Sequence, residues 1–157
     1  MTIHKLRAAG CATLLAMLAA GPALSQEIGA RPTFADLNLS SGFTPDPYTV
    51  RLTAGGTIDA ARTRGGSCVG KIASAPDIRL TYTAGSLPIN IKAISSEDTT
   101  LVINGPDGSW YCDDDSGGGH NPMFHLSRPT TGVYEIWVGT YGDTPVQATV
   151  QITEVVN

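Results

Sequence analysis

Residues 98–119 read DTTLVINGPDGSWYCDDDSGGG, and this stretch decides the expected fold. A short apolar run, 101–103, precedes a turn sequence of Asn, Gly, Pro, Asp and Gly at positions 104–108. A second short run, 109–112, follows the turn and leads into three aspartates and a glycine run. Glycine and asparagine adopt the backbone conformations that tight turns need, so this pattern predicts a β-hairpin.

The chain on both sides of the hairpin repeats the short-strand pattern. Apolar and polar residues alternate at 48–52, 78–82 and 89–93 before it, and at 133–138 and 146–153 after it. Turn-forming residues separate these runs, and the chain carries 18 glycines and 10 prolines. A period of two with this punctuation predicts an all-β fold, a single antiparallel β-sandwich of jelly-roll or immunoglobulin-like type.

The first 25 residues have the anatomy of a cleaved secretory signal. A basic start at positions 4–7 precedes an apolar run at 8–20, and small residues surround Ser25. The run is shorter than the ~20 apolar residues that span a bilayer, so we favour a signal over a membrane anchor. We expect cleavage near Ser25, a periplasmic or secreted protein, and no membrane span afterwards. Residues 26–47 would then be a lead-in segment and 48–157 the sandwich domain.

Cleavage would also change the charge and the cysteine content of the chain. It removes Lys5 and Arg7 but no acidic residue, so the net charge becomes −6 instead of −4. No basic patch is visible, which argues against binding to nucleic acid or to anionic membranes. Cleavage removes Cys11 as well, and the remaining Cys68 and Cys112 are expected to pair, because two cysteines in an exported chain most often do. Two free thiols are the alternative.

Several short motifs follow one another in a set order along the chain. They are Ala54-Gly55-Gly56, Asp98-Thr99-Thr100-Leu101-Val102-Ile103, Pro106-Asp107-Gly108, Asp113-Asp114-Asp115 and Gly132-Val133-Tyr134. In order and spacing they resemble the bacterial pre-peptidase C-terminal (PPC) domain. The resemblance implies a β-sandwich that often serves as an accessory module of secreted hydrolases and sometimes binds calcium. Thr100 departs from the family pattern, which has a second aspartate there.

The acidic residues around the hairpin predict a calcium site. Ca²⁺ takes six to eight oxygen ligands, from carboxylates, carbonyls and water. If Asp98 opens one strand and the three aspartates close the other, their side chains share one end of the sheet. A solvated acidic turn is the alternative. The predicted ligands are Asp98, Asp113, Asp114, Asp115 and Asn104.

The string Asp115-Ser116-Gly117-Gly118 resembles the nucleophile motif of trypsin-like serine proteases. In those enzymes the catalytic His and Asp both precede the Ser, whereas His120 and His125 follow Ser116 here. We expect His120 to be a turn residue and His125 a surface or half-buried one. We therefore predict that the protein is not an enzyme, and a small serine hydrolase or peptidase-related protein is the alternative.

Trp110 and Trp137 are candidates for a binding surface. Strand alternation places them opposite Tyr111 and Tyr134, so both tryptophans face outward if the tyrosines face the core. The alternative, which we favour, is that the tryptophans pack in the core under a second layer of structure.

Together these observations predict a periplasmic or secreted, non-catalytic binding or accessory module, with calcium as its candidate cofactor. The protein or glycan partner and the oligomeric state stay open. An alternative role is assembly through a sheet edge, for which the alternating segment 146–155 is the candidate.

Overall fold

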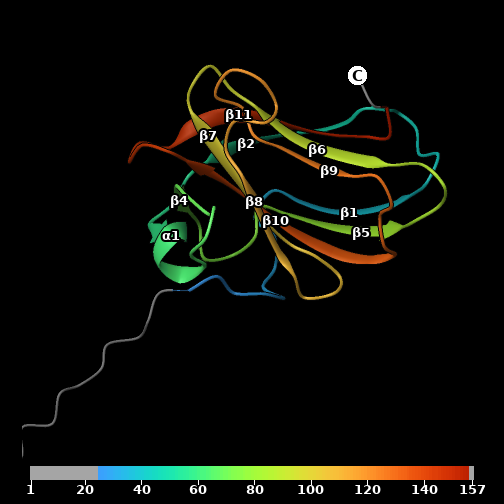
Figure 1. Cartoon of the computed structure of the whole chain (residues 1–157), viewed down its shortest axis with the longest axis horizontal. Helices are drawn as coiled ribbons and strands as arrows, with labels where there is room; N and C mark the ends of the chain where they lie inside the picture. The colour runs from blue at the N-terminus through green and yellow to red at the C-terminus, as the bar shows by residue number, and fades with distance from the viewer. Residues whose placement is uncertain (1–24, 156–157) are drawn as a thin grey trace, which may run out of the picture.

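The computed structural model describes residues 25–155, so the predicted signal peptide lies outside the described residues apart from Ser25. The described chain is almost entirely β-structure, with one short helix (Figure 1). The elements are β1 (Ala35–Ser40), β2 (Tyr48–Ala54), β3 (Ile58–Asp59), α1 (Ala60–Thr63), β4 (Lys71–Ile72), β5 (Ile78–Thr83), β6 (Ile89–Ile94), β7 (Thr99–Asn104), β8 (Trp110–Asp113), β9 (Met123–Leu126), β10 (Gly132–Thr140) and β11 (Val146–Thr153).

The strands form two sheets that pack face to face, which confirms the predicted β-sandwich (Figure 1). The smaller sheet has the order β2-β11-β6-β9. In the larger sheet β10 is central: it pairs with β5 on one edge and with β7 on the other, and β8 pairs with β7. Beyond the end of β5, β4 meets β10 at Thr140, and β3 pairs with β4. All of these pairs are antiparallel except β1 with β5, which is parallel.

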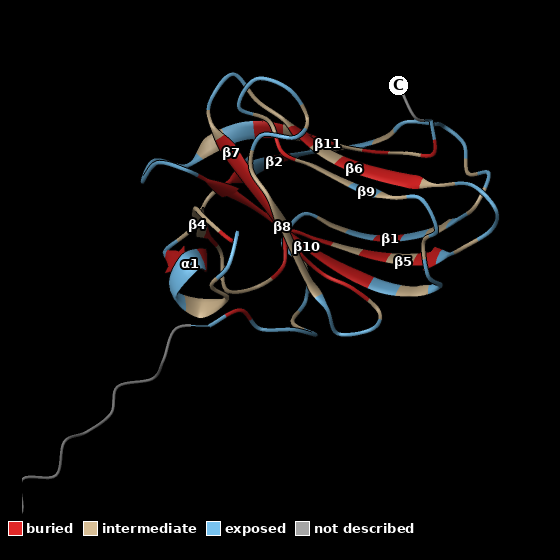
Figure 2. Cartoon of the chain, viewed as in Figure 1, coloured by how far each residue is buried: buried red, intermediate tan, exposed pale blue. Residues whose placement is uncertain are grey.

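The main hydrophobic core lies between the two sheets, and Figure 2 shows the buried residues concentrated in the middle strands. Each strand contributes alternate residues, because successive side chains of a strand point to opposite faces. From β7, for example, Leu101 and Ile103 enter this core, and from β10 Tyr134, Ile136 and Val138 do so.

A second, smaller core lies on the outer face of the larger sheet. β3, α1 and β4 cover β7 and part of β10 there, so β7 and the residues of β10 from Tyr134 onward are buried on both faces. This cover is what allows a tryptophan on the outer face of β10 to be buried. The members of the second core are Ile58, Ala60, Cys68, Ile72, Val102 and Trp137.

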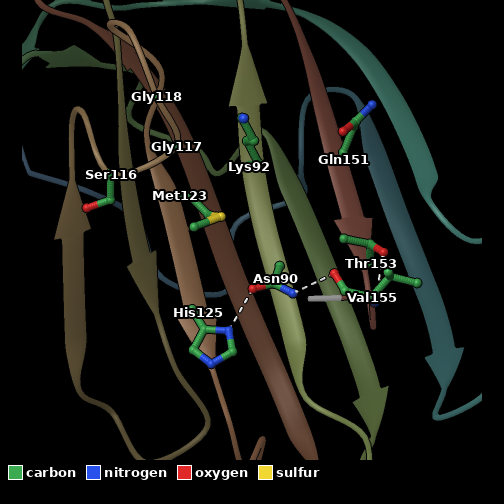
Figure 3. Close-up of a pocket in the computed structure, with 10 residues that line it drawn as sticks. All are labelled: Asn90, Lys92, Ser116, Gly117, Gly118, Met123, His125, Gln151, Thr153 and Val155. Carbon is green, nitrogen blue, oxygen red and sulfur yellow. Dashed lines mark hydrogen bonds between the residues drawn. The ribbon is translucent and has the colours of Figure 1, made fainter. Parts of the chain in front are cut away.

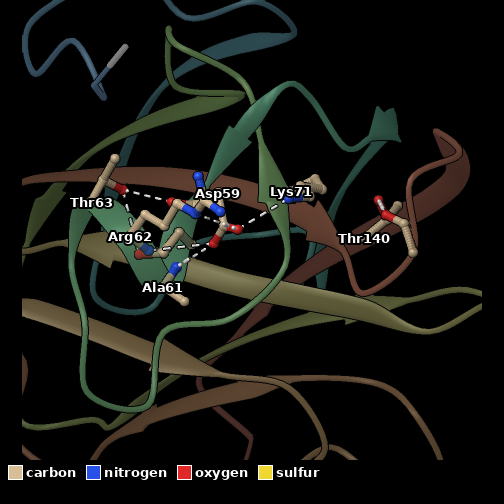
Figure 4. A network of polar contacts seen from close by, with 8 residues as sticks. Asp59, Ala61, Arg62, Thr63, Lys71 and Thr140 are labelled. Atoms are coloured by element: carbon tan, nitrogen blue, oxygen red, sulfur yellow. Dashed lines mark hydrogen bonds and ion pairs between the residues drawn. The ribbon is translucent and has the colours of Figure 1, made fainter. Parts of the chain in front are cut away.

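Asp59 holds this covering layer together (Figure 4). Its Oδ1 accepts a hydrogen bond from the backbone N–H of Ala61 at 3.0 Å, which caps the start of α1. Its Oδ2 accepts a hydrogen bond from Nζ of Lys71 at 3.1 Å, and this contact is the largest cause that lowers the pKa of Asp59. One carboxylate therefore joins β3, α1 and β4.

The segment predicted as a lead-in contributes a strand to the sandwich. Leu37 is buried and Leu39 half-buried in β1, whereas the residues that alternate with them are exposed, which is the pattern of an edge strand. The chain before β1 is also anchored, because Glu135 accepts a hydrogen bond from the backbone N–H of Gly29 at 2.9 Å. Arg79 bridges Glu135 to the carbonyl of Ala30. The sandwich thus begins before residue 48, and the prediction of its boundary is corrected.

The expectation that residues 146–155 form an exposed sheet edge is wrong. β11 pairs with β2 along one side and with β6 along the other, so its backbone groups are used within the sheet. An internal strand offers no unpaired ladder to a second chain.

None of the described helices is long and apolar enough to span a membrane.

Candidate functional site

The β7–β8 hairpin places the predicted metal ligands at two different ends of the sheet. Asp98 directly precedes β7, whereas Asn104 is its last residue. At that far end, Nδ2 of Asn104 donates to the carbonyls of Gly108 and Ser109, at 3.2 and 3.3 Å, and so closes the turn. Six residues of strand, at about 3.4 Å each, separate the two ends. Asn104 therefore does not share a cation with Asp98, which corrects this part of the predicted site.

Asp113 organises the loop that follows β8. Its Oδ2 accepts hydrogen bonds from the backbone N–H groups of Ser116 and Met123, at 3.0 and 2.8 Å. The Ser116 hydroxyl donates to Oδ1 of the same carboxylate. These bonds close the loop and attach it to β9. Both oxygens of Asp113, a predicted calcium ligand, are thus occupied in holding the loop.

Asp98, Asp115 and His120 do come together at the near end of the hairpin. One ligand atom from each lies within 4.8 Å of the others. Nδ1 of His120 lies 3.8 Å from Oδ2 of Asp98 and 3.7 Å from Oδ1 of Asp115. Oδ1 of Asp98 is buried without a hydrogen-bond partner in the described part of the chain. Backbone bonding supports this arrangement, because the N–H of Thr99 donates to the carbonyl of His120 at 3.2 Å.

Asp114 lies beside this cluster without belonging to it. Burial is the largest cause that raises its pKa, and the negative charges of Asp115, Asp113 and Asp98 raise it further. Repulsion among neighbouring carboxylates is what a bound cation relieves. The three consecutive aspartates have separate roles because β8 ends at Asp113, and strand alternation no longer governs the residues after it.

The disulfide prediction is confirmed. Cys68 and Cys112 are bonded, with their Cα atoms 5.0 Å apart. The bond connects β8 to the segment between α1 and β4, and so covers the second core. The disulfide therefore joins two segments that the fold already brings side by side.

The predicted tryptophan surface is wrong for Trp137. Its side chain is 0% exposed and its Nε1 donates to the carbonyl of Ser74 at 3.2 Å. Trp110 is half-buried and packs against it, with ring centroids 5.5 Å apart. Cζ of Arg64 lies 3.7 Å from the centroid of the Trp110 ring and covers its outer side. The alternation argument failed because both faces of β10 are covered.

Replacing Arg64 by alanine is expected to lower the free energy of unfolding by about 1 kcal/mol, the usual size of a partly buried cation–π contact. The change would also expose the Trp110 ring, so tryptophan emission should move to longer wavelength. Urea unfolding followed by fluorescence measures both effects. Arg62→Ala is the matched control, because Arg62 lies on α1, two residues before Arg64, and its side chain is 87% exposed. Equal effects of the two changes would contradict the contact.

The serine at position 116 does not have the surroundings of a nucleophile. Its hydroxyl donates directly to Asp113 and is hydrogen-bonded to no histidine within residues 25–155. Nδ1 of His125 is instead 2.7 Å from Oδ1 of Asn90. A triad needs the histidine between the serine and the carboxylate, and this order is not present in the described chain.

A pocket of about 470 Å³ lies on the outer face of the smaller sheet, beside the same loop (Figure 3). Apart from Ser116 and His125, the sequence analysis did not single out its polar residues, because they are ordinary outward positions of separate strands. The one sequence signal is that polar residues occupy alternate places in β6 and β11. The lining residues come from β6, β9 and β11, from loop 116–118 and from Val155.

Comparisons with known proteins found matches among solved structures only. No protein-family model and no curated protein matches the sequence. Among solved structures, the chain is similar to the pre-peptidase C-terminal domain of collagenase from Bacillus anthracis, with a TM-score of 0.46 and 12% identity over 78% of this chain and 98% of that domain. It is also similar to PliG from Aeromonas hydrophila, a periplasmic inhibitor of g-type lysozyme, with a TM-score of 0.37 and 12% identity over 76% of this chain and 97% of that one.

The family that the sequence motifs resemble is thus among the structural matches. Because both TM-scores lie below 0.5, no role of either protein is transferred to this chain. The functional argument rests on the loop cluster and on the sheet-face pocket.

Proposed function

We propose that this protein is a non-catalytic binding module of the periplasm or the extracellular space, stabilised by a divalent cation. The observation that carries the proposal is that a single loop, 113–121, serves two sites. It supplies Asp115 and His120 to the cluster with Asp98, and its residues 116–118 form one wall of the sheet-face pocket. A cation in the cluster would therefore order the wall of a binding pocket.

The donor set decides which cations fit the cluster. The carboxylates of Asp98 and Asp115, with Asp114 beside them, suit Ca²⁺, which prefers oxygen ligands. The imidazole of His120 is instead a typical ligand of Zn²⁺. The buried, unpartnered Oδ1 of Asp98 supports a bound cation of either kind, since it lacks any other compensation among the described residues.

Export to an oxidising compartment fits the same proposal. The Cys68–Cys112 bond needs such a compartment to form and persist. The basic and apolar start of the sequence is the signal that would direct it there.

Excess Ca²⁺ is expected to raise the melting temperature of the mature chain, residues 26–157, above its value in chelator. A site filled at about 100 times Kd stabilises the native state by about 2.7 kcal/mol, which is several degrees for a domain of this size. Asp98→Asn and Asp115→Asn should abolish the shift. Asp36→Asn, an exposed change on β1, should preserve it.

The same melting experiment with Zn²⁺ and with His120→Ala identifies the cation. A calcium site keeps most of its shift without the imidazole, whereas a zinc site loses it. If neither ion shifts the melting temperature of the wild-type chain, the cluster is a solvated acidic turn and the cation part of the proposal fails.

A further inference from the structure

The sheet-face pocket presents two rows of side chains across three paired strands, and all of them except Met123 are polar. Neighbouring strands lie about 4.8 Å apart, so each row is a flat, evenly spaced set of side chains. The sheet holds the spacing, because the pairing register fixes which residues are neighbours. The first row is Gln151, Lys92 and Met123, and the second is Thr153, Asn90 and His125.

Asn90 makes the second row rigid. Its side chain is only 5% exposed, and both of its polar atoms are used (Figure 3). Nδ2 donates to the carbonyl of Val155 at 3.1 Å, so Oδ1 must accept from Nδ1 of His125 at 2.7 Å. In neutral His125 the proton therefore sits on Nδ1, and Nε2 is left as an acceptor. The buried amide thus sets the hydrogen-bonding character of an exposed ring.

The loop wall of the pocket depends on a glycine. A Cβ at Gly117 would lie 2.7 Å from the carbonyl oxygen of Asn121 and 3.1 Å from Cε of Lys92. Only a residue without a side chain lets the loop approach the sheet this closely. The stem of Lys92 packs under the loop, and Figure 3 shows its Nζ directed toward the loop end of the pocket.

The charge of the pocket differs from that of the whole chain. The chain has a net charge of −4, yet among residues 25–155 no carboxylate side chain lines the pocket, and Lys92 is the one lining residue there with a permanent charge. Within residues 25–155 the Lys92 ammonium forms no ion pair, and no hydrogen bond uses the side-chain amide of Gln151. The hydroxyl of Thr153 accepts from the backbone N–H of Val155 and can still donate.

We propose that this pocket binds an acidic saccharide, a sugar whose ring carries a carboxylate beside several hydroxyls. Lys92 would pair with the carboxylate, and the amide, hydroxyl and imidazole groups of the two rows would bind the sugar hydroxyls. Each sugar hydroxyl both donates and accepts, and Gln151 offers both functions from one side chain. The volume of about 470 Å³ lies in the usual range for small-molecule sites.

A neutral sugar and an extended peptide fit the pocket less well. The described lining residues include no Trp, Tyr or Phe, so the imidazole of His125 is the one ring there that could stack on the face of a neutral sugar, and the charge of Lys92 is the strongest contact available. An added peptide strand needs unpaired backbone groups at a sheet edge. The pocket instead spans β11, β6 and β9, whose facing backbone groups already pair with one another.

This proposal rests on the binding-module function but does not require the cation. The test is isothermal titration of the mature chain with a uronic-acid trisaccharide, a neutral trisaccharide and a sulfated trisaccharide, each in Ca²⁺ and in chelator. We expect the uronate to bind more tightly than the neutral sugar. Binding of the sulfated sugar alone would assign the pocket to sulfate esters and overturn the carboxylate proposal.

The variants separate a specific contact from general charge. Lys92→Met keeps most of the apolar stem and should raise the uronate Kd by about tenfold or more, as expected when a hydrogen bond to a charged group is lost. Arg51→Met removes the same charge from the same sheet, on β2 and outside the pocket, and should leave the Kd within about twofold, because exposed charges act weakly at a distance.

Circular dichroism of both variants checks that the fold is intact. Equal losses in Lys92→Met and Arg51→Met, equal affinity for neutral and acidic sugars, or no binding of the uronate would each overturn the proposal. The melting-temperature experiment with cations is independent of these results, so failure of the saccharide site and failure of the cation site are distinguishable.

Discussion

Replacing both Cys68 and Cys112 by alanine is expected to lower the free energy of unfolding by about 4 kcal/mol, within the 2 to 5 kcal/mol that native disulfides usually contribute. The two residues are 44 positions apart, so the bond closes a long loop and removes many conformations from the unfolded chain. Alanine is preferred to serine at these positions because Cys68 is buried in the second core. Urea unfolding of the oxidised chain and of the double variant measures the difference.

The dependence on urea distinguishes two origins of this effect. If the bond acts by constraining the unfolded state, its removal lets the unfolded chain expose more surface, and the m-value rises. If the loss arises from weaker packing around Trp137, the m-value stays the same. A double variant within about 1 kcal/mol of the wild type would contradict a structural role for the bond, against the 2 to 5 kcal/mol expected.

The stability of the protein is expected to fall as the pH rises from about 4 to about 7, because of Asp77. Asp77 precedes β5 and is 2% exposed. The ladder between β5 and β10 ends where Ile78 pairs with Ile136. Asp77 continues it: its N–H donates to the carbonyl of Ile136 at 2.8 Å, and its Oδ2 accepts from the N–H of Val138 at 2.7 Å. The carboxyl group thus takes the place of a strand residue inside the sandwich.

Burial raises the pKa of Asp77 from 3.8 to about 7, although the hydrogen bond from Val138 opposes the shift. Below pH 3.8 the carboxyl is protonated in both the folded and the unfolded chain, so its burial carries no charge penalty and the free energy of unfolding is not reduced. Between the two values the unfolded chain has lost its proton and the folded chain keeps it, so stability decreases. Above pH 7 the full penalty applies, about 4 kcal/mol for a shift of this size.

Asp77→Asn isolates this contribution. Asparagine carries no charge and can still accept the hydrogen bond from Val138, so its stability lacks this pH dependence. Urea unfolding from pH 4 to pH 8 measures the free energies of unfolding of the wild type and the variant. The wild type should lose stability relative to the variant as the pH rises. Asp36→Asn, an exposed change on β1, should follow the wild type. A difference between wild type and Asp77→Asn that is constant with pH would refute the buried titration.

The fold class and the disulfide could be predicted because both depend on local or covalent patterns. Alternation with a period of two reports that a strand has two different faces, and this was enough for most of the sandwich strands. The same reasoning misjudged residues 35–40, where the nearby Gly29 and Pro32 concealed a six-residue alternation around Leu37 and Leu39. It also misjudged β11, because the pattern of a strand carries no information about its partners on either side.

The candidate sites were harder to predict, because each joins residues from separate elements. Asp98 was predicted correctly to lie near the triple aspartate, since a hairpin brings the ends of its strands together. Asn104 was assigned to the wrong end of that hairpin. His120 was expected to be a turn residue and not a ligand, because only the path of the glycine-rich loop brings its ring back to Asp98.

The amino-acid sequence alone determined that the chain forms a β-sandwich, that Cys68 and Cys112 are the cysteines available to pair, and that the acidic groups gather near one hairpin. These properties follow from side-chain periodicity and composition. The tertiary structure decided that Trp137 is buried, that Asp77 sits inside the sandwich, and that Lys92 lies in a pocket whose described lining residues include no carboxylate. Each of these depends on which surfaces pack together, and desolvation and charge are set by neighbours that are distant in the chain.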